Sequence, residues 1–125
     1  MNTKQRGKWG EDIALEFLKL NGYITVATGF RSRFGEIDLI VRNKEYLVFT
    51  EVKTRKNTNF AHAREYVTKQ KQRKIIATAN YWLAIRPTKL QPRFDVIEVY
   101  AADGEITSSP EIIHIENAFG ALQKG

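Results

Sequence analysis

Two neighbouring segments decide the fold, Gly35-Glu-Ile-Asp-Leu-Ile-Val-Arg42 and Tyr46-Leu-Val-Phe-Thr-Glu-Val-Lys-Thr54. Both are rich in the β-branched and aromatic residues that favour strands, and the connection between them, 43–45, is short enough for an antiparallel hairpin. Because strand side chains alternate between two faces, each segment is apolar on both of its faces. Strands of this kind lie in the centre of a sheet that helices cover on both sides.

The same alternation assigns the side chains of these strands to faces. In the first strand it predicts one face with Glu36, Asp38 and Ile40 and an opposite face with Ile37, Leu39 and Val41. In the second strand it predicts one face with Leu47, Phe49, Glu51 and Lys53 and an opposite face with Val48, Thr50 and Val52. Asp38 can therefore share a face with Glu51 and Lys53.

The rest of the chain supplies elements that flank this hairpin. The patterns predict helices over about 4–20 and 63–85 and further strands over about 23–28, 93–100 and 112–115. A polar segment, 29–34, is predicted to connect the strand 23–28 to the hairpin. No repeat or long linker interrupts the sequence, so residues 1–125 are expected to form a single α/β domain, with a mixed central sheet and a helix on each side.

The composition excludes several classes of protein. The 125 residues include no cysteine, which excludes disulfides, zinc sites of the Cys type, iron–sulfur clusters and thiol catalysis. No run of roughly 20 apolar residues could span a bilayer. The acids that follow the basic N-terminus do not fit a signal peptide, so the expected location is the cytoplasm. The net charge of +6 and the pI near 9.7 favour a polyanionic partner such as nucleic acid.

Three charged residues, Asp38, Glu51 and Lys53, interrupt the apolar strands. Because a buried carboxylate is costly without a partner, such acids need an ion pair or a metal. An ion pair between Glu51 and Lys53 on a solvated strand end would explain the second strand alone. Asp38 on the neighbouring strand favours a divalent-metal site, and carboxylate oxygens suit Mg²⁺, with Mn²⁺ as the alternative ion. With Lys53 near a phosphate oxygen or the attacking water, the set predicts metal-assisted phosphodiester hydrolysis.

These residues also match a known family. Gly35-Glu-Ile-Asp38, followed after twelve residues by Glu51-Val-Lys53, resembles the PD-(D/E)XK nuclease motif, with Ile37 in the place of the motif's proline. Further blocks of the pattern are Gly10-Glu11, Lys71 and Arg93-Phe-Asp-Val96. Together the blocks resemble the small bacterial YraN family, also called UPF0102, which is similar to archaeal Holliday junction resolvases.

The resemblance implies a restriction-endonuclease-like fold and a Mg²⁺-dependent endonuclease that acts on DNA, including branched structures of the Holliday-junction kind. It implies Asp38 and Glu51 as metal ligands, Lys53 as the catalytic lysine and Glu11 as an additional catalytic and metal-binding acid. Similarity to the resolvases further implies a homodimer. The alternatives are a non-catalytic protein that binds DNA or RNA on the nuclease scaffold, and a protein-interaction subunit that needs neither.

Several of these residues also have structural explanations. Glu11 could be an acid favoured by the dipole in the first turn of its helix. Lys71, which interrupts the apolar stripe of the second helix, could extend its ammonium into solvent. For Lys53, the neighbouring acids raise the pKa of the ammonium, so charge stabilisation and orientation of water are expected rather than proton abstraction.

Basic and aromatic residues complete the set of candidates. The residues expected to bind nucleic-acid phosphates are Arg31, Arg33, Arg55, Lys56 and Lys71. Trp9, Tyr81 and Trp82 are interpreted as core aromatics and not as base-stacking platforms. Asp95 is expected to pair with a nearby arginine, and His62 and His114 are too isolated for a zinc site.

Overall fold

The structure, a computed structural model of the chain, describes residues 2–56 and 67–120. Its elements in chain order are α1 (Thr3–Leu20), β1 (Ile24–Ser32), β2 (Gly35–Arg42), β3 (Tyr46–Arg55), α2 (Lys69–Ile85), β4 (Gln91–Tyr100), the short 3₁₀ helix η2 (Gly104–Ile106) and β5 (Glu111–Phe119). No helix among these described residues combines the length and the apolar character needed to cross a membrane.

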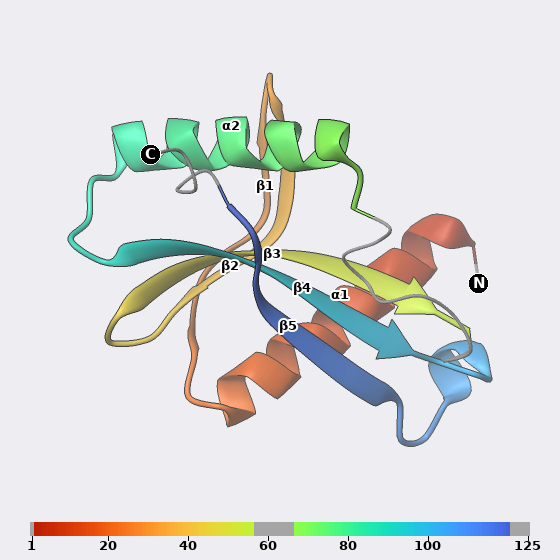
Figure 1. Cartoon of the computed structure of the whole chain (residues 1–125). Helices are drawn as coiled ribbons and strands as arrows, with labels where there is room; N and C mark the ends of the chain where they lie inside the picture. The colour runs from red at the N-terminus through yellow and green to blue at the C-terminus, as the bar shows by residue number, and fades with distance from the viewer. Residues whose placement is uncertain (1, 57–66, 121–125) are drawn as a thin grey trace.

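The strands form one mixed sheet in the order β1-β2-β3-β4-β5. Neighbouring strands are antiparallel, except that β3 and β4 run parallel from Tyr46 opposite Gln91 to Arg55 opposite Tyr100. A parallel pair needs a crossover connection, and α2 lies in this one. Figure 1 shows α1 on one face of the sheet and α2 on the other. The predicted fold class is confirmed, and the architecture is consistent with a restriction-endonuclease-like fold.

A hydrophobic cluster fills the space on each side of the sheet. On the α2 side, Trp82 packs with Phe49, and on the α1 side, Leu18 packs with Val48. Phe49 and Val48 are chain neighbours that point to opposite clusters, which confirms the alternation predicted for this part of β3. Both faces of the central strands are therefore buried, as expected for a sheet between two helices.

One predicted assignment of faces is wrong. Ile37 packs with Ile40 in the α2-side cluster, whereas Leu39 and Val41 belong to the α1-side cluster. The reason is that the pairing of β2 with β3 begins only at Leu39, and the residues of β2 before Leu39 pair with β1 in a hairpin that extends past α2 (Figure 1). The faces of β2 therefore turn relative to the rest of the sheet.

The ends of several elements differ from the prediction. The segment 29–34, predicted as a connection, is strand up to Ser32, because Phe30 pairs with Ile37 and packs against the α2-side cluster. The second helix begins at Lys69, because Thr68 has extended backbone and its hydroxyl accepts the N–H of Lys71 at 3.0 Å. The predicted helical residues 63–66 lie outside the described part of the chain. The predicted strand 112–115 extends over 111–119.

The three predicted core aromatics have different environments. Trp82 is buried in the α2-side cluster, and Trp9 is partly buried against the α1-side cluster. Tyr81, in contrast, is 44% exposed, so its prediction is wrong. The reason is its position on α2: the buried stripe of the helix passes through Ala79 and Trp82, and Tyr81 lies beside it, toward the tip of the β1–β2 hairpin.

Candidate active site

The strands β2 and β3 separate near the centre of the sheet. Their pairing ends at Leu39 opposite Thr50. At Asp38, the residue of β2 that precedes Leu39, a side chain takes the place of the missing backbone partner, since its Oδ2 accepts the N–H of Val52 at 2.8 Å. This hydrogen bond holds the carboxylate of Asp38 beside Glu51, so the structure brings together acids from two strands.

The environment of Asp38 disfavours its charge. Burial and the nearby charge of Glu51 raise the pKa of Asp38 to about 8, and the charge of Glu11 adds to this effect. The N–H of Val52 and the ammonium of Lys71 lower the pKa but do not compensate. Without a bound cation, Asp38 therefore keeps its proton at neutral pH.

Helix α1 carries Glu11 into the same site. The helix lies close against β3 because residue 10 is glycine: a Cβ at Gly10 would collide with the hydroxyl of Thr54. α1 begins at Thr3 and has no acid in its first turn. Glu11 therefore lies too far along the helix for the dipole of the first turn to explain it.

Glu11 and Asp38 interact directly. Burial and the charge of Glu36 raise the pKa of Glu11, whereas a hydrogen bond with Asp38 lowers it. A hydrogen bond between two carboxyl groups needs a proton on one of them. Because the pKa of Asp38 is raised to about 8, Asp38 is the donor of this bond at neutral pH.

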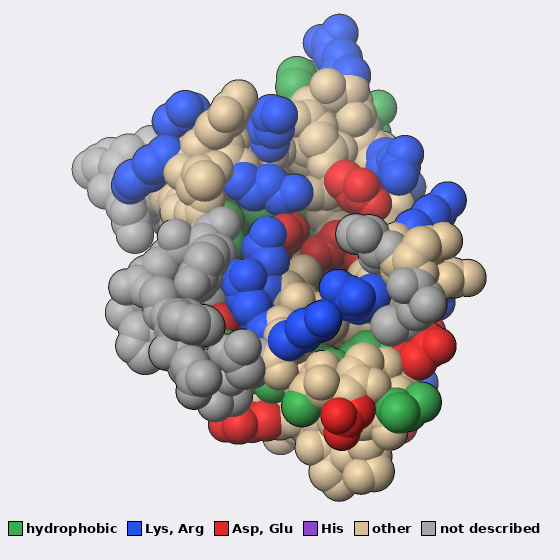
Figure 2. Space-filling model, turned by 90° about the vertical axis from the view of Figure 1, so that its right-hand side faces the viewer, with side chains coloured by type: hydrophobic (Ala, Val, Ile, Leu, Met, Phe, Trp, Pro, Cys, Tyr) green, Lys and Arg blue, Asp and Glu red, His purple; other side chains and the backbone are tan. Residues whose placement is uncertain are grey.

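Two ammonium groups flank Glu51, whose side chain is only 6% exposed. Nζ of Lys53 lies 3.5 Å from Oε2 of Glu51, and Nζ of Lys71, which comes from α2, lies 3.7 Å from the same oxygen. The ion pair of Glu51 with Lys53 thus joins a buried carboxylate to an ammonium whose side chain is 28% exposed. Figure 2 shows Lys and Arg side chains gathered around recessed acidic side chains on the face where β3 and β4 end.

The donor set suits a hard divalent cation without forming a closed cage. Asp38 and Glu51 offer carboxylate oxygens, the ligands that Mg²⁺ and Mn²⁺ prefer, and a cation would relieve their mutual repulsion. In the part of the chain that the structure describes, no three Asp, Glu or His side chains are grouped to hold one ion. Glu11 thus contacts Asp38 without completing a cage of three carboxylates. An ion held by Asp38 and Glu51 would keep positions for water, as Mg²⁺ usually does.

Comparison with known proteins identifies the family to which this chain belongs. The model of the "Uncharacterised protein family UPF0102" matches residues 10–99, a range that contains every residue of the site described above. The chain therefore belongs to the UPF0102 family. The family resemblance found in the motif blocks is confirmed.

Relatives of this UPF0102 protein match it over nearly their whole length. A UPF0102 protein of Legionella pneumophila is 43% identical over 121 residues, which cover 95% of this chain and 98% of the relative. One of Caldanaerobacter subterraneus is 42% identical over 120 residues, covering 95% and 98%. One of Clostridioides difficile is 38% identical over 120 residues, covering 95% and 100%.

The basic residues expected to bind phosphate lie at two places in this UPF0102 protein. Arg31 and Arg33 belong to the β1–β2 hairpin, and Arg55, Lys56 and Lys71 lie where β3 ends and α2 begins. Lys56 is exposed, and the side chain of Lys71 is 44% exposed, so both ammonium groups reach solvent. The side chain of Arg55 is 26% exposed, and its Nε lies 3.6 Å from a buried acid, Glu98.

Glu98 is a buried residue of the UPF0102 site region that the sequence interpretation missed. Its side chain is 1% exposed, and its Oε2 lies 3.6 Å from Nε of Arg55. Burial, a hydrogen bond with Glu98 and the charge of Glu98 raise the pKa of Tyr100 to about 12, so the phenol stays protonated. A signal was present in the sequence, because Glu98 interrupts an apolar run of β4 in the way that Glu51 interrupts β3.

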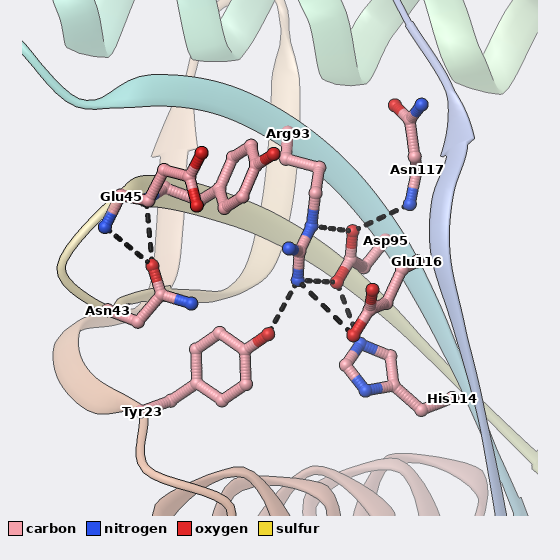
Figure 3. A network of polar contacts seen from close by, with 9 residues as sticks. Tyr23, Asn43, Glu45, Arg93, Asp95, His114, Glu116 and Asn117 are labelled. Atoms are coloured by element: carbon pink, nitrogen blue, oxygen red, sulfur yellow. Dashed lines mark hydrogen bonds and ion pairs between the residues drawn. The ribbon is translucent and has the colours of Figure 1, made fainter.

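A second polar cluster joins β4 and β5 on the α1 side of the UPF0102 sheet (Figure 3). The fully buried carboxylate of Asp95 accepts two bonds from Arg93, at 2.9 and 2.8 Å, and one from the N–H of Asn117 at 3.0 Å. Nε2 of His114 lies 2.7 Å from the same carboxylate. Burial alone would raise the pKa of Asp95, but the bonds with His114, Arg93 and Asn117 lower it. The predicted pairing of Asp95 with an arginine is confirmed; His62 lies outside the described residues.

Proposed function

We propose that this UPF0102 protein is a metal-dependent nuclease of the PD-(D/E)XK type that hydrolyses phosphodiester bonds of DNA. The observation that carries the proposal is the meeting of Asp38 and Glu51 where β2 and β3 separate, with Lys53 beside Glu51. A structural carboxylate is normally surrounded by donors that stabilise its charge, as Asp95 is. Asp38 instead has a pKa of about 8, which a divalent cation would lower.

The chain's own residues have distinct roles in this proposal. Asp38 and Glu51 would hold Mg²⁺ or Mn²⁺, and the bound ion would polarise a phosphate oxygen and lower the pKa of a water. Lys53 directs its ammonium to the same side as Glu51, where it stabilises the negative charge that develops on the phosphate and orients the water. Because the ammonium of Lys53 lies 3.5 Å from the carboxylate of Glu51, its proposed role is charge stabilisation and orientation of the water, not that of the base.

Two further groups complete the proposed site. Lys71 offers a second ammonium to the phosphate from α2, 3.7 Å from Glu51. Glu11 forms a hydrogen bond with Asp38 in the metal-free protein and so positions that carboxyl group before a cation replaces the proton. Glu11 is therefore a positioning residue with respect to Asp38 in this proposal.

Nucleic acid as the substrate is supported by charge. The chain carries a net charge of +6, and the acids of the site lie recessed among Lys and Arg side chains (Figure 2). Such an arrangement attracts a polyanion to the rim while leaving the centre free for a cation. DNA in preference to RNA, branched substrates and a homodimer with one site for each of two strands are parts of the proposal that the resemblance to junction resolvases supports. A cytoplasmic location is a further part of the proposal, which the lack of cysteine fits.

A cleavage screen tests the proposal. Linear duplex, single-stranded, flap and four-way DNA, with an RNA counterpart of each, are incubated with Mg²⁺ or Mn²⁺. The wild type is expected to cleave at least one DNA form. Lys53→Ala is expected to cleave roughly 10²- to 10³-fold more slowly, which is the typical loss when one charge-stabilising donor is removed, and to bind DNA as the wild type does. Lys44→Ala, which removes an exposed lysine from the β2–β3 turn, is the matched control and should behave as wild type.

Two outcomes would contradict the proposal. Equal rates for the wild type and Lys53→Ala would identify the activity as a contaminant. Salt-dependent DNA binding without cleavage of any form would instead favour the non-catalytic binding protein.

A further inference from the structure

The tip of the β1–β2 hairpin forms a cavity against helix α2. The cavity has a volume of about 390 Å³ and is lined by Arg31, Ser32, Arg33, Phe34 and Tyr81. This volume lies within the range of about 300–1,000 Å³ that is typical of sites for small organic groups. We infer that this cavity binds an unpaired base of the nucleic acid; the inference rests on the proposed function, because it names the part of the substrate that the same protein recognises.

Two exposed aromatic rings form the walls of the cavity. Phe34 is 38% exposed and Tyr81 is 44% exposed. Their ring centroids are 6.2 Å apart, with 59° between the ring planes. Single exposed apolar residues are common on protein surfaces, whereas two aromatic rings beside one another around a cavity indicate a binding site.

Contacts between β1 and α2 hold the two rings in place. The ring of Phe30 stacks with Tyr81 at 6.3 Å, and the buried Trp82 contacts Phe30 edge-on at 4.9 Å. The hydroxyl of Ser32 lies 3.2 Å from that of Thr78, which ties the hairpin to α2. The cavity is therefore formed before a ligand arrives, which lowers the entropic cost of binding.

The charges around the rings identify the ligand as part of a polyanion. The guanidinium of Arg33 lies over the ring of Phe34, 5.0 Å from its centroid. The side chain of Arg31 is 79% exposed, and its Nε lies 3.6 Å from Glu36. Aromatic rings and guanidinium planes stack with nucleobases, while arginine charges bind the adjoining phosphates. An apolar partner protein would have no need of the two arginines.

The position of the cavity explains why the base must be unpaired. Phe34 precedes Asp38 by four residues, which corresponds to about 13 Å of extended strand. At about 3.4 Å per nucleotide, this length corresponds to about four nucleotides of a strand that runs from the metal centre to the hairpin tip. The bases of an intact duplex are stacked inside it, so the rings can reach a base only at a flap, a bulge, a junction or an end.

Fluorescence of 2-aminopurine tests this inference without any metal. A short DNA duplex with one unpaired 2-aminopurine is titrated with protein in EDTA, beside the same duplex fully paired. Stacking in the cavity is expected to quench the unpaired base. Phe34→Ala or Tyr81→Ala is expected to weaken binding of this DNA by roughly 5- to 150-fold, with no change for the paired duplex.

Conservative and distant variants serve as controls. Phe34→Tyr and Tyr81→Phe keep the rings and should keep the quenching. Ile106→Ala removes an apolar side chain that is 82% exposed in η2 and should have no effect. Because quenching is measured in EDTA and needs no cleavage, failure of the nuclease proposal and failure of this inference are distinguishable.

Three results would overturn the inference. Quenching could be unaffected by the loss of either ring. Phe34→Ala could weaken the paired and the unpaired DNA equally, which would make the tip a phosphate contact only. Phe34→Ala could instead change the sedimentation mass of the protein without changing the quenching, which would make the tip a contact between protein chains.

Discussion

Replacement of Asp38 by asparagine should make the metal-free protein more stable. The pKa of Asp38 is about 8 in the folded protein and 3.8 for an ordinary aspartate. The folded state therefore binds the proton more tightly than the unfolded chain does, so this group's stabilising contribution is complete below about pH 3.8 and is lost as the pH rises through about 8. Asparagine does not titrate, and its amide can still accept the N–H of Val52 and donate to Glu11.

The size of the effect follows from the width of this pH window. Each pH unit between the two pKa values changes the free energy of unfolding of the wild type, relative to Asp38→Asn, by about 1.4 kcal/mol. Over the interval of about 4 pH units, the variant should gain on the order of 5 kcal/mol, a large part of the total stability of a typical domain.

Urea denaturation in EDTA, at a series of pH values from 4 to 8.5, measures this difference. The slope of free energy against urea should be equal in both proteins, so that the midpoints report stability alone. Asp103→Asn, at an exposed aspartate before η2, keeps Asp38 and is the control; its stability should follow that of the wild type across the series. A difference between Asp38→Asn and wild type that stays constant across the series would refute the reasoning, because the proton would then not reside on Asp38.

Three further predictions concern the surroundings of the site. Gly10→Ala should destabilise the protein by about 1–3 kcal/mol, since its Cβ would collide with Thr54. Gly7→Ala, with open space around it on the same helix, should stabilise the protein by about 0.5–1 kcal/mol. Equal effects of the two variants in urea denaturation would contradict the close packing of α1. Binding of Mn²⁺, measured by calorimetry, should strengthen up to about tenfold per unit as the pH rises from 6 to 8, because Asp38 must release its proton; a constant affinity would exclude Asp38 as a ligand. Asp95→Asn should cost about 3–5 kcal/mol at neutral pH. Because the pKa of Asp95 is lowered, this loss of stability should disappear only as the pH falls below the pKa of an ordinary aspartate. Acid denaturation curves of both proteins measure this.

The local sequence was sufficient to predict the parts of the fold that depend on neighbours in the chain. The alternation of β3 placed Phe49 and Val48 in opposite clusters, and the charged residues within apolar strands indicated the site. The turn of β2 just before Leu39, which places Ile37 on the α2 side, depends on contacts with a distant helix. No local pattern contains that information.

The same limit applies to individual side chains. Tyr81 follows an apolar helical pattern, yet its exposure is decided by where the β1–β2 hairpin ends relative to α2. The partner of Glu98 is likewise set by the parallel pairing of β3 with β4, which brings Arg55 beside it. Sequence reasoning recognised Arg55 as basic but could not predict that a buried acid would hold it.

Two buried aspartates in this protein have environments that shift their pKa values in opposite directions. Asp95 is surrounded by donors from Arg93, His114 and Asn117, which lower its pKa although burial opposes this. Asp38 receives a single backbone N–H, from Val52, and is set beside other acids, so its pKa rises to about 8. Arginine or histidine next to Asp38 would have stabilised the fold in the same way as at Asp95. The absence of such a partner from its described surroundings leaves a carboxyl group whose charge is disfavoured without a cation. Under the proposed function a divalent cation would relieve this cost, which is the expected trade-off between stability and activity.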